Sequence, residues 1–183
     1  MIFKSYVLEK NIDLASNCKM FLFYGDNEGL KKEFKQILRK RDKSKILLFF
    51  QEDIIKKNNL LTNEVFNKSL FDDKITIFIE QTDDKILKIV ENYKNLESVE
   101  IFLFASALSK KSKLRSFFEK SKNFGLSACY ADNEITIRKI IQEKLGNIQG
   151  LTPSVINYVI QNTGLDRKKI NNEIKKIKTY FYN

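Results

Sequence analysis

The residues best suited to chemistry lie in a short turn near the N-terminus. Gly25 and Gly29 are separated by three residues, follow the apolar run Met20–Tyr24 and precede a lysine-rich stretch. A strand, a Gly-rich turn and a helix in this order are typical of a phosphate-binding loop. Such a loop, G-x-x-x-x-G-K-[ST], brings backbone N–H groups, a lysine and a hydroxyl to phosphates and Mg²⁺. Here the glycines are one residue too close and Leu30 replaces the lysine, so we expect a non-functional loop.

Acidic residues make the turn still less suited to a nucleotide. Asp26 and Glu28 lie inside it, and their charges would repel a triphosphate. A second departure from a working ATPase site follows the apolar run 75–79. Glu80 and Gln81 stand there in place of the acidic pair that binds Mg²⁺ in an ATPase. Only one carboxylate remains there. The sequence therefore predicts a kept nucleotide-binding scaffold with no cofactor, no metal and no catalytic residues of its own.

Composition narrows the remaining possibilities. A chain of 183 residues with 43% hydrophobic content can form one α/β domain and a small appendage. The absence of histidine and the wide separation of Cys18 and Cys129 exclude zinc sites and Ser-His or Cys-His nucleophile pairs. No apolar run approaches the roughly 20 residues of a membrane span. We expect a cytoplasmic protein without a membrane partner.

A net charge of +10 indicates an anionic partner, with nucleic acid first in line. The basic residues are mostly lysine, however, and a lysine excess on solvated faces is also expected from an A/T-biased genome. Both explanations stay open. The cluster most suited to phosphate contacts, through side chains and the N–H groups of a helix start, consists of Lys110, Lys111, Lys113 and Arg115. Its alternative is a solvated helix end.

Five runs that are apolar on both faces recur at intervals suited to alternating strands and helices. They are Met20–Tyr24, Lys45–Phe50, Ile75–Glu80, Val99–Ala105 and Leu126–Tyr130. Such runs are typical of a parallel sheet covered by helices. Between them we expect helices over 31–39 and 113–120, the latter capped by Ser112, and two further helices capped by Thr62 and Thr82. The pattern predicts a doubly wound α/β layer.

The pattern changes after Tyr130. Helix-start signals occur at 132–134, at Thr152-Pro153 and at Asp166, and stop signals occur at Gly146 and Gly164. No strand-like run follows. We therefore predict two domains, an α/β domain over 1–132 and a three-helix lid over 133–183.

Three stretches resemble the delta subunits of the bacterial DNA polymerase III clamp loader, which belong to the AAA+ class. They are FLFYG at 21–25 with Leu30 after the turn, NKSLFDDKI at 67–75, and LTP at 151–153 followed by IQNTGLD at 160–166 and NEIKKI at 172–177. In order and spacing they cover essentially the whole chain. The resemblance implies a RecA-like AAA+ sheet domain with a lid. That family also carries a C-terminal collar domain, and we expect it to be absent here.

Leu70 and Phe71 are the favoured binding residues. A large apolar pair among the polar residues 67–69 and 72–73 is typical of a protruding anchor, which can dominate an interface. The alternative is that Phe71 packs into the core. The resemblance implies that Leu70 and Phe71, with Ser69, enter the hydrophobic cleft of the sliding clamp, the polymerase III beta subunit. It also implies gamma/tau and delta prime subunits as partners, and primed DNA through the complex.

The resulting hypothesis is a delta-type subunit that binds and opens the clamp while ATP acts on neighbouring subunits. Any nucleotidyltransferase activity would belong to the polymerase holoenzyme as a whole. One rival is a divergent phosphate-loop NTPase or kinase that uses Lys31 or Lys32 with Glu80, which nucleotide binding would reveal. Another is a basic nucleic-acid-binding adaptor, whose affinity would fall steeply with salt.

Overall fold

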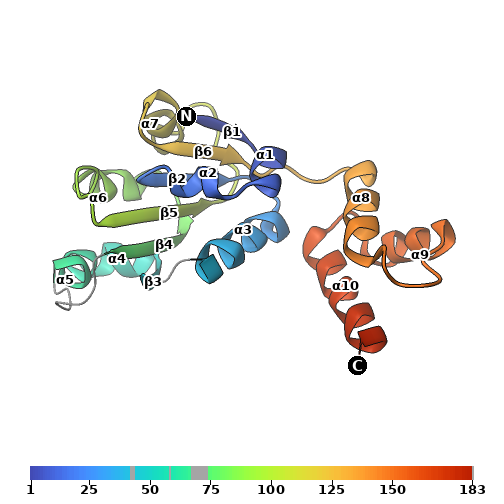
Figure 1. The fold of residues 1–183 in the computed structure, drawn as a ribbon. Coiled ribbons are helices and arrows are strands. Elements are labelled where there is room, and N and C mark those ends of the chain that lie inside the picture. Colours follow the sequence, from blue (N-terminus) through green and yellow to red (C-terminus); the bar gives the residue numbers. More distant parts are fainter. Residues whose placement is uncertain (42–43, 58, 67–73, 183) are drawn as a thin grey trace. The chain divides into compact units, whose positions relative to one another are not determined.

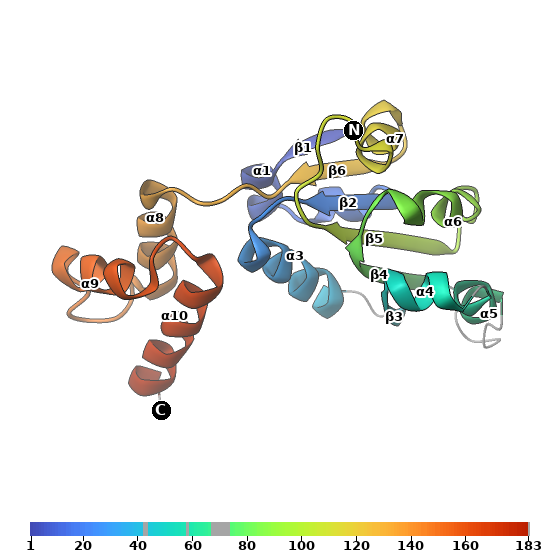
Figure 2. The same cartoon turned by 180° about the vertical axis from the view of Figure 1, so that it is seen from behind.

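The structure is a computed structural model that describes residues 1–41, 44–57, 59–66 and 74–182. The chain forms two compact units (Figures 1 and 2). The α/β unit contains Met1–Gly25 and Phe34–Cys129, and the helical unit contains Asp26–Glu33 and Tyr130–Asn183. The first turns of the helix that follows the Gly-rich turn thus group with the helical unit, although the sequence analysis placed them in the first domain.

A six-stranded sheet forms the centre of the α/β unit. Its strands lie in the order β1-β6-β2-β5-β4-β3, and every neighbouring pair is parallel. The strands are β1 (Ile2–Lys4), β2 (Met20–Tyr24), β3 (Lys45–Phe50), β4 (Ile75–Thr82), β5 (Val99–Ala105) and β6 (Gly125–Ala128). All five residues of β2 and all seven of β5 are buried, as expected for central parallel strands with both faces covered.

The helices of the α/β unit lie on both faces of this sheet (Figures 1 and 2). They are α1 (Ser5–Lys10), α2 (Asp13–Ser16), α4 (Gln51–Lys56), α5 (Leu60–Phe66), the 3₁₀ turn η1 (Asp84–Ile86), α6 (Leu87–Glu91), α7 (Lys113–Lys120) and the later part of α3 (Glu28–Arg41). On one face, Leu22 belongs to the same core cluster as Ile54 of α4 and Phe118 of α7. On the other, Phe23 contacts Phe104 and Phe34 of α3, with ring centroids 5.2 and 5.3 Å apart.

The parallel α/β fold is confirmed. The bounds of β2, β3 and β5 match their predicted runs, whereas β4 continues to Thr82 and β6 ends at Ala128. The strand β1 was missed, because three residues with one half-buried position carry no periodic signal.

Two predicted helix caps were wrong. Thr82 is the last residue of β4, and the side chain of Asp83 caps η1 instead by accepting from Lys85 N–H. Thr62 lies inside α5, where its hydroxyl hydrogen-bonds the Tyr93 hydroxyl at 2.8 Å. The Ser112 cap is confirmed, because its hydroxyl accepts from Arg115 N–H at 3.2 Å.

The helical unit contains α8 (Glu134–Leu145), α9 (Pro153–Thr163) and α10 (Arg167–Tyr182). Asn133, Thr152 and Asp166 cap these helices by accepting backbone N–H groups. The unit has its own apolar core, which includes Ile141 of α8 and Ile170 of α10. Within the described ranges, no helix is long and apolar enough to cross a membrane.

Candidate functional site

The candidate site is the Gly-rich turn and the start of α3, where a nucleotide-binding protein would hold phosphates. Gly25 has φ of +126°, and a Cβ there would lie 2.3 Å from the backbone oxygen of Cys129. Close approach of two backbone segments therefore requires this glycine. Cys129 N–H also donates to the Tyr24 carbonyl at 2.6 Å. The first glycine of the turn thus serves backbone packing in the α/β unit.

Gly29 serves packing between two helices of the helical unit. It is the second residue of α3, and a Cβ on it would lie 2.6 Å from the backbone nitrogen of Lys168 and 2.8 Å from the Cβ of Arg167. The start of α10 is therefore in direct contact with the start of α3. Leu30, which stands where a phosphate loop has its lysine, is 2% exposed.

The backbone N–H groups of Glu28 and Leu30, at the start of α3, are already bonded to protein atoms. Asn27 is 7% exposed, and its side-chain oxygen accepts from Leu30 N–H at 3.0 Å. The amide nitrogen of Asn27 donates to the Tyr130 carbonyl at 3.1 Å and to the Asp132 carboxylate at 2.8 Å. A helix start binds phosphate through such N–H groups when they are unoccupied. Asn27 therefore takes part of the role that a phosphate would have.

A partly buried ionic network continues from this turn. Arg167, at the first position of α10, is 4% exposed and donates to Glu33 of α3 at 2.8 Å and to Asp132 at 3.3 Å. Glu33 also accepts from Lys144 at 2.7 Å and from Asn171 at 2.5 Å. Two carboxylates thus surround one guanidinium.

The charge balance of this network favours ionised carboxylates. Burial alone would raise the pKa of Glu33, but the hydrogen bond from Lys144 and the charge of Arg167 outweigh it, and the pKa lies below its usual value. An arginine beside a phosphate loop could hold a nucleotide by bidentate contacts. Here Glu33 and Asp132 already pair with Arg167, so its guanidinium is not available to a phosphate.

Glu80, the one carboxylate that remains near the end of β4, is also paired. Glu80 forms an ion pair with Lys35 of α3, and both side chains are one-quarter exposed. The next residue, Gln81, has φ of +56°, and the pairing of β4 with β5 shifts register between Ile79 and Thr82. The bulge therefore lies between Glu80 and the end of β4 at Thr82. Across residues 1–41, 44–57, 59–66 and 74–182, no group of three or more metal-ligating side chains comes together.

The predicted basic cluster is divided by the structure. Lys110, Lys111 and Lys113 are exposed at the start of α7. Arg115 instead lies over the ring of Tyr24, 5.1 Å from its centroid, and donates to Glu119 at 2.8 Å.

The backbone N–H groups expected to bind phosphate at this helix start are occupied. Asp84 accepts from Lys113 N–H at 3.1 Å, from Leu114 N–H at 2.9 Å and from the Ser112 hydroxyl at 2.6 Å. The hydrogen bonds from Ser112 and from Leu114 N–H hold the pKa of Asp84 below its usual value. Only the lysine side chains of the cluster are therefore available for phosphate contacts.

The predicted clamp-binding residues Ser69, Leu70 and Phe71 lie outside the described residues. Phe66, which ends α5 just before them, has 64% of its surface exposed.

The residues that sequence reasoning missed are Glu33, Asp132 as an ion-pair partner, and Arg167. A signal was present. Arg167 is one of only five arginines among 33 basic residues, and arginine suits buried ion pairs better than lysine does.

Comparisons with solved structures place the fold. The Bacillus subtilis DNA clamp loader delta protein (YqeN) matches 96% of this chain with a TM-score of 0.65 and 14% sequence identity. AMPPCP-bound DnaA from Aquifex aeolicus matches 94% with a TM-score of 0.56 and 20% identity. The chain has an AAA+-like fold. It spans 57% and 59% of the length of those two chains.

The fold also occurs beyond these bacterial proteins. Rif2 from Saccharomyces cerevisiae matches 87% of the AAA+-like chain with a TM-score of 0.51 and 12% identity. No protein-family model and no curated protein sequence matches the chain.

Proposed function

We propose that this AAA+-like chain is a delta-type clamp-loader subunit that binds and opens a sliding clamp without using ATP itself. The supporting observation is the closure of the phosphate-loop region by Asn27, Arg167 and Glu33 on a fold similar to that of a clamp loader delta protein. A chain that keeps this fold but fills its nucleotide region with protein groups fits a mechanical role. ATP would then act on neighbouring gamma/tau subunits.

In this proposal the first domain, 1–132, carries the clamp contact and 133–183 is the lid. Leu70 and Phe71, with Ser69, form the anchor that enters the apolar cleft of the clamp. Clamp opening is a population shift, because the subunit promotes it only as far as it binds the open ring better than the closed one. Partners would be the clamp, gamma/tau, delta prime and, through the complex, primed DNA in the cytoplasm.

Two of the three groups named for the rival NTPase or kinase function are already paired. Lys31 is 4% exposed and forms an ion pair with Glu28 at 2.7 Å, and Glu80 pairs with Lys35. These contacts leave Lys31 and the proposed carboxylate engaged with protein, whereas Lys32, the other lysine of this alternative, is exposed. No observation in the structure favours this alternative.

Calorimetric titration against a bacterial sliding clamp tests the proposal. The double variant Leu70→Ala/Phe71→Ala should lower clamp affinity by about a thousandfold or more, because anchors of this size cost roughly 2–4 kcal/mol each on truncation. The thermal midpoint should stay unchanged. Binding should depend little on salt, because the contact is apolar.

Tyr158→Ala is a suitable control, because Tyr158 is 68% exposed on α9 of the helical unit. It should leave clamp affinity unchanged. A double variant that unfolds would place the pair in the core, where truncation costs about 5 kcal/mol or more. A folded double variant that binds the clamp like wild type would refute the anchor.

A further inference from the structure

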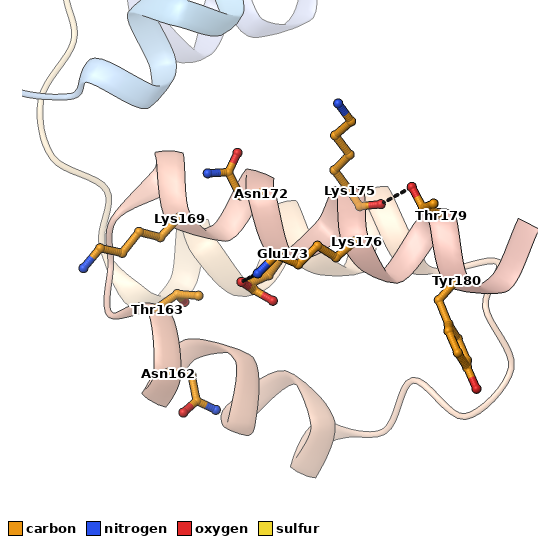
Figure 3. A pocket seen from close by; sticks show the side chains of 9 residues that line it. All are labelled: Asn162, Thr163, Lys169, Asn172, Glu173, Lys175, Lys176, Thr179 and Tyr180. Atoms are coloured by element: carbon orange, nitrogen blue, oxygen red, sulfur yellow. Dashed lines mark hydrogen bonds and ion pairs between the residues drawn. The ribbon is translucent and has the colours of Figure 1, made fainter.

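A second potential binding surface lies in the helical unit, along α10. An open groove of about 890 Å³ runs along α10 beside the C-terminal end of α9 (Figure 3). Three lysines, two asparagines, two threonines, one glutamate and one tyrosine line it. None of the described residues that line it has an aliphatic side chain. This lining offers cationic and hydrogen-bonding groups to an anionic ligand, while the carbon atoms of the same side chains form most of the groove surface.

The sequence of α10 explains why this groove is basic. The helix contains six basic residues and one acidic residue. Its core side is formed by Arg167, Ile170 and Ile174, which are buried. Helical periodicity then places the remaining basic residues, all lysines, on exposed positions.

The groove lysines are available to a ligand. Lys169 has no carboxylate within 4.0 Å among the residues the structure describes, and Lys176 pairs only with Glu173, at 2.6 Å. The Lys176 and Glu173 side chains are 72% and 38% exposed, and such surface pairs are weak enough to exchange. Lys169 and Lys176 are seven residues apart, about 10 Å along the helix, which matches the rise of about three stacked nucleotides.

An aromatic ring lies at one end of the same groove. Tyr180 is 82% exposed and contacts Phe181 edge to face, with centroids 5.2 Å apart. Figure 3 shows its ring beyond Lys176, on the side of α10 that faces the groove. Asn162 and Thr163, at the C-terminal end of α9, border the other end. Single-strand-binding surfaces combine basic groups that follow the backbone with aromatic rings on which bases stack.

We propose that the α9–α10 groove binds single-stranded nucleic acid. Lys169 and Lys176 contact phosphates about three nucleotides apart, and a base stacks on Tyr180. Glu173 lies between the two lysines in sequence. When a phosphate binds, Lys176 leaves Glu173 and pairs with the phosphate, and water hydrates the Glu173 carboxylate. A membrane surface fits less well, because it would require apolar residues along the same face. This proposal does not depend on clamp binding.

Fluorescence anisotropy of a labelled oligo-dT of about 15 nucleotides tests the groove with the full chain. Lys169→Gln/Lys176→Gln should weaken binding and reduce the slope of log affinity against log salt by about 1.4, which corresponds to two phosphate contacts at about 0.7 each. Tyr180→Leu should weaken binding by at least about fivefold and leave the salt slope unchanged, because the lost contact is stacking.

Lys168→Gln/Lys178→Gln is the matched control. It removes the same charge from exposed positions of the same helix, but neither residue lines the groove. This variant should bind within about twofold of wild type. Equal losses for both double variants would show general attraction to a basic helix and overturn the proposal. So would equally strong binding of a duplex of the same length, or no binding of oligo-dT by wild type. Unchanged circular dichroism and thermal midpoints would show that each variant is folded.

Discussion

At the scale of single residues, Arg167 is the side chain on which the phosphate-loop region depends. It is buried and holds Glu33 and Asp132 together. Removing one partner of a buried ion network leaves uncompensated charge and typically costs about 3–5 kcal/mol. We therefore expect Arg167→Met to lower the free energy of unfolding by about that amount, measured by urea denaturation.

An exposed arginine of the same unit provides the control for this prediction. Arg138 pairs with Glu134 one turn away at 2.6 Å, and their side chains are 36% and 57% exposed. Such pairs contribute only about 0.3–0.5 kcal/mol. Arg138→Met should therefore have a small effect, and equal costs for the two variants would contradict the role assigned to Arg167.

The same network predicts a pH dependence through Glu33. Because its pKa is lower in the folded than in the unfolded state, the unfolded chain binds more protons between the two values. The stabilisation is therefore complete above the ordinary glutamate pKa of about 4.3 and is lost as pH falls through the folded value. We expect the stability difference between wild type and Glu33→Gln to be larger at pH 7 than near pH 3.

Thermal unfolding across this pH range measures the effect. Glu143→Gln, at an exposed position of α8 where the carboxylate lies 3.7 Å from Lys139, should differ little from wild type throughout. A constant difference between wild type and Glu33→Gln at all pH values would show that the glutamate acts by packing rather than by charge.

At the scale of elements, one substitution tests the contact between the starts of α3 and α10, because the contact decides whether the melting temperature rises or falls. In an open helix, Gly→Ala stabilises by about 1 kcal/mol. At Gly29 the added Cβ would lie 2.6 Å from Lys168 nitrogen, so the two helices would have to move apart. We expect Gly29→Ala to lower the melting temperature. An increase would mean that the helix starts are not in close contact.

The strands were far more predictable than the ends of the elements. A run such as Val99–Ala105 is apolar at nearly every position, and burial on both faces makes that signal strong. The end of β4 gave no such signal, because Gln81 adopts a positive φ that its residue type rarely takes. Local propensity therefore pointed to Thr82 as a helix cap, whereas the strand continues through a bulge.

At the scale of the whole molecule, the sequence predicted a broken phosphate loop but not what replaced its ligand. The departures from the phosphate-loop motif all lie within residues 25–30, so the sequence alone shows them. The pair Arg167 and Glu33 is separated by 134 positions, and no periodicity or spacing rule connects such residues. Asn27 similarly bonds Asp132 across 105 positions. Contacts of this kind depend on how the chain returns to the turn, which only the folded structure reveals.

The closed turn leads to a prediction for the complete chain, which is that ATP does not stabilise it. A ligand at 100 times its Kd would raise the free energy of unfolding by about 2.7 kcal/mol, which is roughly 5–10 °C in thermal midpoint for a chain of this size. With 1 mM ATP and Mg²⁺ we therefore expect the thermal midpoint to rise by less than about 1 °C, as measured by calorimetry.

The variant Asp26→Asn/Glu28→Gln separates two causes, because it removes the acidic charges of the turn and leaves Asn27, Arg167 and Glu33 in place. If occupation by these protein groups prevents binding, the variant should also show no shift with ATP. A shift of several degrees in the variant alone would mean that charge repulsion was the only barrier, and a shift in wild type would refute the closed site.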